Sequence, residues 1–255
     1  MGMTVGAQLY TLRDYCRTPE DFACTLRRVA DMGYTTVQVS GTCAYTGTWL
    51  RDALKCAGLT CTLTHVAPQS ILDDAQAVCR THEAFSCRYV GIGGANPWFK
   101  EEKDYEAFRD AFLPAARAIK NAGKYFMYHN HYMEFGRDKN GVSYFERMLE
   151  DFAPDEMGIT LDTYWLQYAG GDSRLWLEKL KGRVPCVHLK DMAVVDCTPR
   201  MAPVGDGNFD YESLLKAAED AGTGYLYVEQ DDCFEEDPFD CLKKSLRYLN
   251  ALGLK

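Results

Sequence analysis

Four segments in the second half of the sequence place histidine and carboxylate residues at the ends of short β-like runs. They are Tyr128-His129-Asn130-His131, Leu161-Asp162-Thr163, Val187-His188-Leu189-Lys190-Asp191 and Val228-Glu229-Gln230-Asp231. Taken singly, such a residue is commonly a helix cap, a satisfied core histidine or half of an ion pair. Burying so many ionisable groups together is costly unless they are paired or bind a cation. The four segments therefore indicate a site for one divalent metal.

The side chains of this group limit both the metal and the chemistry. Mixed imidazole and carboxylate ligands suit Mn²⁺, Mg²⁺, Co²⁺, Fe²⁺ or Zn²⁺, while the lack of thiolate ligands argues against structural zinc. Of these ions we expect Mn²⁺. A cation with open positions can hold the carbonyl and neighbouring hydroxyl oxygens of a sugar-like substrate. It then stabilises the enediolate that forms when a base removes the proton between them.

These residues need a scaffold in which the ends of several strands meet. Strand-like runs alternate with helix-like segments along the chain, and the eight runs are Thr4–Tyr10, Thr35–Ser40, Thr60–Val66, Tyr89–Gly93, Lys124–His131, Gly158–Thr163, Pro185–Asp191 and Tyr225–Asp231. Four of the helix-like segments end at a glycine, the residue type that adopts the left-handed C′ conformation without steric cost: Gly33, Gly58, Gly123 and Gly222.

Alternating strands and helices pair in parallel, and eight such units in about 250 residues predict a closed barrel. We therefore expect an α/β protein with a single (β/α)₈ TIM-barrel domain over residues 1–255. A six-stranded open sheet would leave two strong strands unexplained. In the barrel, the active site is expected at the carboxyl ends of the strands.

Composition narrows the class of partner. The chain has 255 residues and a formal net charge of −9, which argues against nucleic acid as a partner. Its 11 cysteines include no C-x-x-C pair and are expected to be reduced core thiols. No apolar run approaches the roughly 20 residues of a membrane span, so we expect no membrane partner and a cytoplasmic location.

The motifs also resemble those of the sugar phosphate isomerase/epimerase family, within the xylose isomerase-like TIM-barrel superfamily. The resemblance rests on His129-Asn130-His131-x-x-Glu134-Phe135, Leu161-Asp162-x-Tyr164-Trp165, His188-Leu189-Lys190-Asp191, Val204-Gly205-x-Gly207, Val228-Glu229-Gln230-Asp231 and the first-strand segment Gly6-Ala7-Gln8-Leu9-Tyr10-Thr11-Leu12-Arg13. Motif order and spacing make it specific for the superfamily but a poor guide to the substrate.

The resemblance implies one metal ligand from each of strands five to eight, commonly Glu, Asp, His and Glu. Asp162, His188 and Glu229 match three of these positions. At the fourth, strand alternation favours His129, whereas carboxylate chemistry and reach from the loop favour Glu134.

The departure on strand five leaves the catalytic base open among His131, Glu134 and Glu229. A histidine with a pKa near neutrality suits such a proton transfer. Lys190 either holds a substrate oxygen or pairs with Asp231 or Asp191. The expected substrate contacts are Gln8, Gln38, His65, Trp165, Lys190 and Asp231. Glycines of Val204–Asp210 are expected to let the backbone approach the ligand, and Asp210 to cap the next helix.

The predicted function is metal-dependent isomerisation or epimerisation of a sugar, keto-sugar or polyol derivative through an enediolate. A dehydratase or lyase acting on a 3-keto-sugar or inosose would use the same proton abstraction. Less favoured are an endonuclease IV-like DNA-repair enzyme and a non-catalytic sugar-binding barrel. The rim offers few basic residues, so an unphosphorylated substrate is favoured. A homo-oligomer or a partner subunit is compatible with the sequence.

Overall fold

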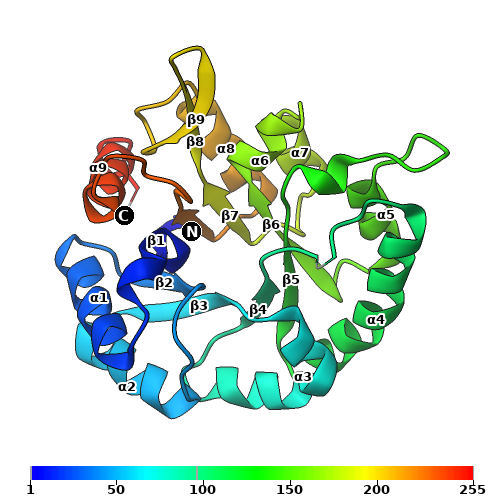
Figure 1. The fold of residues 1–255 in the computed structure, drawn as a ribbon, viewed down its shortest axis with the longest axis horizontal. Helices are drawn as coiled ribbons and strands as arrows, with labels where there is room; N and C mark the ends of the chain where they lie inside the picture. Colours follow the sequence, from blue (N-terminus) through cyan, green and yellow to red (C-terminus); the bar gives the residue numbers. More distant parts are fainter. Residues whose placement is uncertain (1, 96, 255) are drawn as a thin grey trace.

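The computed structural model describes residues 2–95 and 97–254, and these form a closed eight-stranded parallel barrel (Figure 1). The strands follow one another in the order β1-β10-β7-β6-β5-β4-β3-β2, so that β1 pairs with both β10 and β2. Their bounds are β1 Thr4–Gln8, β2 Thr36–Val39, β3 Thr60–His65, β4 Tyr89–Ile92, β5 Tyr125–His129, β6 Met157–Asp162, β7 Cys186–Leu189 and β10 Tyr225–Val228. Each lies within or almost within one predicted run, and the (β/α)₈ prediction is confirmed.

Helices surround the strands as a ring (Figure 1). They are α1 Pro19–Asp31, α2 Gly47–Ala57, α3 Pro68–Glu83, α4 Glu102–Asn121, α5 Tyr144–Asp151, α6 Thr163–Tyr168, α7 Ser173–Lys179, α8 Tyr211–Ala221 and α9 Pro238–Ala251, with short 3₁₀ helices at Leu9–Tyr15 and Met133–Phe135. The four glycines predicted to follow helices all have positive φ, from 71° at Gly58 to 108° at Gly33. Each ends a helix by directing the chain into the next strand.

Two apolar cores stabilise this arrangement. The larger lies between the strands and the surrounding helices. The smaller fills the barrel interior and consists of Leu63, Tyr89, Met127, Cys186 and Tyr227. The interior is therefore packed and not a pore, which leaves the carboxyl ends of the strands as the open end of the barrel.

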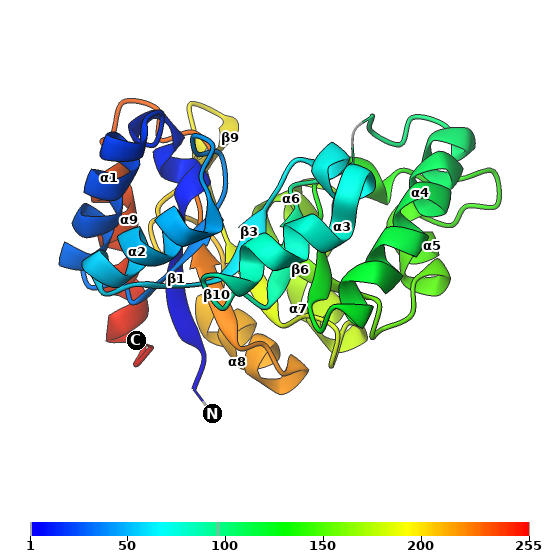
Figure 2. The ribbon, with the colours of Figure 1, turned by 90° about the horizontal axis from the view of Figure 1, so that it is seen from below.

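An antiparallel hairpin interrupts the connection between β7 and α8 and was not predicted. It consists of β8 Asp191–Val195 and β9 Thr198–Ala202. Asp196 and Cys197 both have positive φ, as a two-residue type I′ turn requires. Figure 2 shows the hairpin at one end of the barrel and both chain termini at the other. Among the described residues, no helix is long and apolar enough to cross a membrane.

Candidate metal centre and active site

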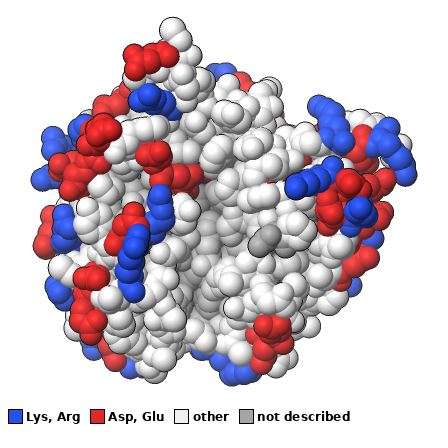
Figure 3. Space-filling model, viewed as in Figure 1, with Lys and Arg blue, Asp and Glu red and all other residues white. Residues whose placement is uncertain are grey.

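A cavity of about 430 Å³ opens where the barrel strands end. Its lining combines all eight strand ends or the loops that follow them, and most of the predicted site residues are part of it: Gln8, Tyr10, Arg13, Ser40, His65, Gly93, Trp98, His129, His131, Trp165, Lys190, Glu229 and Asp231. Figure 3 shows that most charged side chains on this face lie towards its edge, around a hollowed and largely uncharged middle. The charges of the site are therefore buried below the visible surface.

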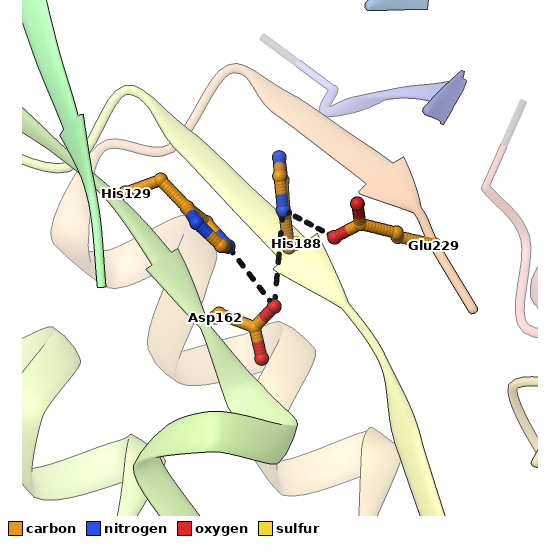
Figure 4. Close-up of side chains that lie close together, drawn as sticks. All are labelled: His129, Asp162, His188 and Glu229. Atoms are coloured by element: carbon orange, nitrogen blue, oxygen red, sulfur yellow. Dashed lines mark hydrogen bonds and ion pairs between the residues drawn. The ribbon is translucent and has the colours of Figure 1, made fainter. Parts of the chain in front are cut away.

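Four side chains at the floor of the cavity form a group that could hold one metal ion. One potential ligand atom from each of His129, Asp162, His188 and Glu229 lies within 4.8 Å of the others (Figure 4). His129 Nε2 is 3.1 Å from Asp162 Oδ2, and His188 Nδ1 is 2.8 Å from Glu229 Oε2. Ligands at about 2.1 Å on opposite sides of one ion are about 4.2 Å apart, so only a small contraction is needed.

The tautomer of His188, with its proton on Nε2, suits the binding of a cation by this group. Its Nε2–H donates to Gln38 Oε1 at 2.6 Å, which leaves the Nδ1 lone pair directed towards Glu229. Two acceptors only 2.8 Å apart repel one another unless a proton or a metal ion lies close to both. Two imidazoles and two carboxylates also form a donor set that suits Mn²⁺, Fe²⁺, Co²⁺ or Zn²⁺.

Neighbouring strands orient the ligands from β5 and β6. Asp162 Oδ1 caps α6 by accepting the backbone N–H of Trp165 at 2.9 Å, and Oδ2 faces the cluster. The backbone N–H of Asp162 donates to Asn130 Oδ1 at 2.9 Å, which ties the end of β6 to the end of β5. His129 Nδ1 lies 3.2 Å from the carbonyl oxygen of Gly93, which holds the ring in place from behind.

Two glutamines from the first strands support the remaining ligands. Gln8 at the end of β1 donates through Nε2 to Glu229 Oε1 at 2.9 Å. Gln38 is fully buried next to His188 and is not part of the cavity lining, although we predicted it to contact the substrate. The structure thus places Gln38 behind a ligand, where it can orient His188 but does not face the cavity.

Lys190 lies beside the metal group and is almost completely buried. Its Nζ is 3.0 Å from Asp162 Oδ2, 2.9 Å from Glu229 Oε2 and 2.9 Å from Asp231 Oδ2. Of the two predicted pairings, it makes the one with Asp231. Burial alone would lower the pKa of Lys190, but the three carboxylates outweigh it and raise that pKa above its usual range.

The charge of Lys190 lowers the pKa of all three carboxylates, but the net shift is downward for Asp162 and Glu229 and upward for Asp231. Burial favours protonation of Asp162, but the charge of Lys190 and the contact with His129 lower its pKa to about 2. The pKa of Glu229 is held well below its usual range against burial, chiefly by Lys190 and His188. Burial, together with the charge of Glu229, raises the pKa of Asp231 to about 6. The two carboxylates of the metal group are therefore ionised at neutral pH.

Two further histidines face the cavity without charge. Burial, assisted by nearby His129, lowers the pKa of His131 to about 3, and burial likewise places the pKa of His65 well below its usual value. The Nδ1 atom of His131 and the Nε2 atom of His65 are buried and have no hydrogen-bond partner among the described residues. The ring of His131 is held between Trp98 and Trp165, with ring centres 5.0 and 5.4 Å away.

Glu134 lies outside the cavity lining. Its Oε1 accepts the hydroxyl of Tyr128 at 2.7 Å, and its Oε2 accepts the backbone N–H of His131 at 2.9 Å. Both oxygens are thus occupied by groups that shape the end of β5. The structure does not bring Glu134 into the group that could hold a metal ion, which includes His129 instead.

The glycines of the loop at Val204–Asp210 have a different purpose from the one predicted. The carboxylate of Asp191 accepts the backbone N–H groups of Gly205, Gly207 and Phe209, and a Cβ at Gly207 would lie 2.2 Å from Asp191 Oδ1. The backbone therefore approaches Asp191, and the prediction of an approach to the ligand is corrected. Asp210 caps α8 as predicted, by accepting the backbone N–H of Ser213.

Sequence reasoning overlooked two contributors. Tyr10 lines the cavity, in a segment known only for its resemblance to a first strand. Thr163 donates its hydroxyl to the backbone carbonyl of Lys190 at 2.9 Å and accepts the backbone N–H of Lys190 at 3.0 Å. It thereby joins β6 to the end of β7. A threonine after a strand carries no sequence signal for such a contact.

Known proteins with related sequences and structures agree with this architecture. Residues 26–252 match the model of the family described as Xylose isomerase-like TIM barrel. An inosose dehydratase from Geobacillus thermodenitrificans is 25% identical over 171 residues, covering 60% of this chain and 56% of that protein. One from Mesomycoplasma hyopneumoniae (strain 7448) is 25% identical over 192 residues, covering 66% and 63%. The matches thus span less than two thirds of the length of either dehydratase.

Among solved structures, a sugar phosphate isomerase/epimerase from Parabacteroides distasonis superimposes with a TM-score of 0.82 at 23% identity, over 98% of this chain and 94% of that one. At this identity the likeness concerns the fold alone. The family match covers most of the chain, from α1 to the end of α9, and thus includes all four residues of the metal group. The chain therefore belongs to the xylose isomerase-like TIM barrel family.

Proposed function

We propose that this protein is a divalent-metal-dependent isomerase or epimerase that acts on a sugar, keto-sugar or polyol derivative through an enediolate. The observation that carries the proposal is the buried group of His129, Asp162, His188 and Glu229 at the floor of an open cavity. When bound there, Mn²⁺ or a similar ion would supply the positive charge that stabilises an enediolate.

His131 is the best candidate for the base that removes the proton next to the carbonyl. It lines the cavity, it is uncharged at neutral pH, and its buried Nδ1 has no partner among the described residues. Glu229 is a weaker candidate, because it belongs to the group that could hold the metal and both of its oxygens already have partners, Gln8 at one and His188 and Lys190 at the other. For Glu134 we propose a positioning role, since it fixes the backbone N–H of His131.

The other lining residues provide substrate contacts of three kinds. The unpartnered Nε2 of His65 is available to a substrate hydroxyl. Trp98 and Trp165 offer apolar surface to one face of a sugar. Gln8 and Asp231 offer polar atoms beside the metal group.

The loop after the hairpin favours an unphosphorylated substrate. Barrels of this kind that bind phosphate commonly do so with backbone N–H groups near the seventh and eighth strands. Here the N–H groups of Gly205, Gly207 and Phe209 already bind the carboxylate of Asp191. That carboxylate is itself negative and leaves no cradle for a phosphate among these groups.

A dehydratase acting on a 3-keto-sugar or inosose is the second candidate. It would use the same proton abstraction, followed by loss of a β-leaving group instead of proton return. The two inosose dehydratases that match 60% and 66% of this chain at 25% identity favour it.

Incubation of the Mn²⁺-loaded protein with a panel of keto-sugars and inososes in D₂O tests both candidates. An isomerase or epimerase incorporates deuterium next to the carbonyl without loss of water, whereas a dehydratase releases an unsaturated product. The variant His131→Gln should lose most of either activity while retaining Mn²⁺. Bound Mn²⁺ and bound sugar with neither product from any panel member would contradict the proposal and favour a binding barrel.

A further inference from the structure

Lys190 contacts the same two carboxylate oxygens that a metal ion in this group would use. Asp162 Oδ2 faces His129 Nε2 at 3.1 Å and Lys190 Nζ at 3.0 Å. Glu229 Oε2 faces His188 Nδ1 at 2.8 Å and Lys190 Nζ at 2.9 Å. In each carboxylate the second oxygen already accepts a neutral donor, the backbone N–H of Trp165 or the amide of Gln8. The oxygens left for a cation are thus the ones that the ammonium contacts.

The third carboxylate is placed to hold the ammonium away from the ligands. Both oxygens of Asp231 contact Lys190 Nζ, at 3.0 and 2.9 Å, and its side chain retains 23% exposure. Asp231 does not belong to the metal group. It can therefore remain the partner of Lys190 when a metal takes the oxygens of Asp162 and Glu229.

The charges of these side chains match a divalent ion. Three carboxylates and one ammonium leave two negative charges, because the two imidazoles are neutral as ligands. All four charged groups are mostly or completely buried, and their interactions are therefore weakly screened.

We propose that Lys190 is an internal cation that competes with the metal for Asp162 and Glu229, and that Asp231 retains the ammonium when the metal binds. Without a metal, Lys190 offsets the repulsion between the two carboxylates, and its competition lowers the affinity of the site for divalent ions. This inference rests on the metal centre of the proposed function and concerns how tightly that centre binds, not which reaction it supports.

Titration of EDTA-treated, dialysed protein with Mn²⁺ by isothermal calorimetry, at constant pH, tests the inference. Lys190→Met should bind Mn²⁺ at least about tenfold more tightly, since a positive charge within a few ångströms of the metal is removed. Asp231→Asn should bind it about tenfold more weakly, because the ammonium then has only the ligand carboxylates as ionised partners. Lys216→Met, which removes an exposed lysine of α8, serves as the control and should match the wild type.

Thermal unfolding gives a second readout. Without metal, Lys190→Met should unfold at a lower temperature than the wild type, and Mn²⁺ should raise its Tm by more than it raises that of the wild type. If Lys190→Met does not fold, Asp231→Asn still decides the matter, because that side chain is partly exposed.

Unchanged or weaker Mn²⁺ binding by Lys190→Met, or unchanged binding by Asp231→Asn, would overturn the proposed competition between Lys190 and the metal. Either result would leave the proposed function intact. Absence of Mn²⁺ binding in every variant would overturn both. Failure of the deuterium test with the predicted order of affinities would overturn only the reaction.

Discussion

The two halves of the barrel rim differ in the kind of side chain they bring to the cavity. β5, β6, β7 and β10 end in the metal group and the charged pair beside it. The strands β1 to β4 themselves end in uncharged groups, namely the amides of Gln8 and Gln38, the neutral imidazole of His65 and the backbone of Gly93, although Arg13 in the 3₁₀ helix after β1 also lines the cavity. The first group, the charged half, could hold a cation, and two amides of the second group, the neutral half, orient two of its members: Gln8 contacts Glu229 from the neighbouring strand β1, and Gln38 contacts His188 from β2.

This division has a physical reason. A buried amide costs far less desolvation energy than a buried charge, so it can support a ligand without requiring another counter-ion. The comparison predicts severe losses from changes in the charged half and graded losses from changes in the neutral half.

Removal of one ligand charge should have the largest effect. In Glu229→Gln, the new side-chain amide can still accept the hydrogen bond from Gln8. The substitution removes the negative charge that Lys190 and His188 both contact. We expect Mn²⁺ affinity to fall by more than about 100-fold, as measured by calorimetry. Glu235→Gln changes an exposed glutamate in the loop after β10 and is the control. Retained affinity in Glu229→Gln would remove this residue from the metal group.

The next test separates His129 from Glu134. His129→Ala should weaken Mn²⁺ binding by about 100-fold or somewhat less. Glu134→Gln should bind Mn²⁺ normally but lose about 2 kcal/mol of stability, roughly 4–8 °C in Tm, because one of two buried acceptors is replaced by a donor.

His82→Ala is the matched control for His129→Ala. His82 is buried in α3 against Thr64, away from the cavity lining, so this variant should lose stability but not Mn²⁺ affinity. Loss of binding in Glu134→Gln with normal binding in His129→Ala would reverse the assignment of the fourth ligand.

In the neutral half, Gln38→Met should have a moderate effect. The substitution keeps the volume but removes the acceptor that selects the tautomer of His188. We expect Mn²⁺ affinity to fall by about tenfold, the lower end for loss of a group behind a ligand. Gln69→Met, on the exposed surface of α3, should have no effect. A loss as large as that of Glu229→Gln would break the distinction between the two halves.

A change of pH should have the smallest effect. Burial opposes protonation of His129, but its contact with Asp162 outweighs burial and raises its pKa above the usual value near 6.5. Because a protonated imidazole cannot bind a metal, Mn²⁺ affinity should fall as the pH decreases through this raised pKa, by at most about tenfold per unit. Calorimetry between pH 8 and pH 6.5 measures the slope, and a constant affinity would contradict it.

The sequence predicted the barrel well because strands and helices have strong local signals. Period-two alternation placed His129 and His131 on the cavity side of β5 and Asn130 on the other, as the structure shows. The hairpin β8–β9 was missed because all but two of its strand residues are exposed or half-buried, so no buried face imposes an alternating pattern.

The contacts among site residues were less predictable because they join distant parts of the chain. Gln38 and His188 are 150 positions apart, and only closure of the barrel brings them together. The sequence left His129 and Glu134 as alternatives for the fourth ligand, and the hydrogen bonds that hold Glu134 to Tyr128 and to the backbone of His131 could not be read from it. Lys190 was predicted to hold a substrate oxygen or to pair with Asp231 or Asp191, but its contacts with Asp162 and Glu229 depend on burial that local patterns do not reveal.

The end of β7 has a consequence for mutational tolerance. Four consecutive residues serve four different surroundings: His188 the metal group, Leu189 the apolar core, Lys190 the carboxylates and Asp191 the loop that begins at Val204. Each of the four residues therefore has its own contacts, and a single inserted residue would exchange the inward and outward side chains. Divergence towards new substrates is therefore more readily accommodated in the outer loops and in the hairpin that follows this segment.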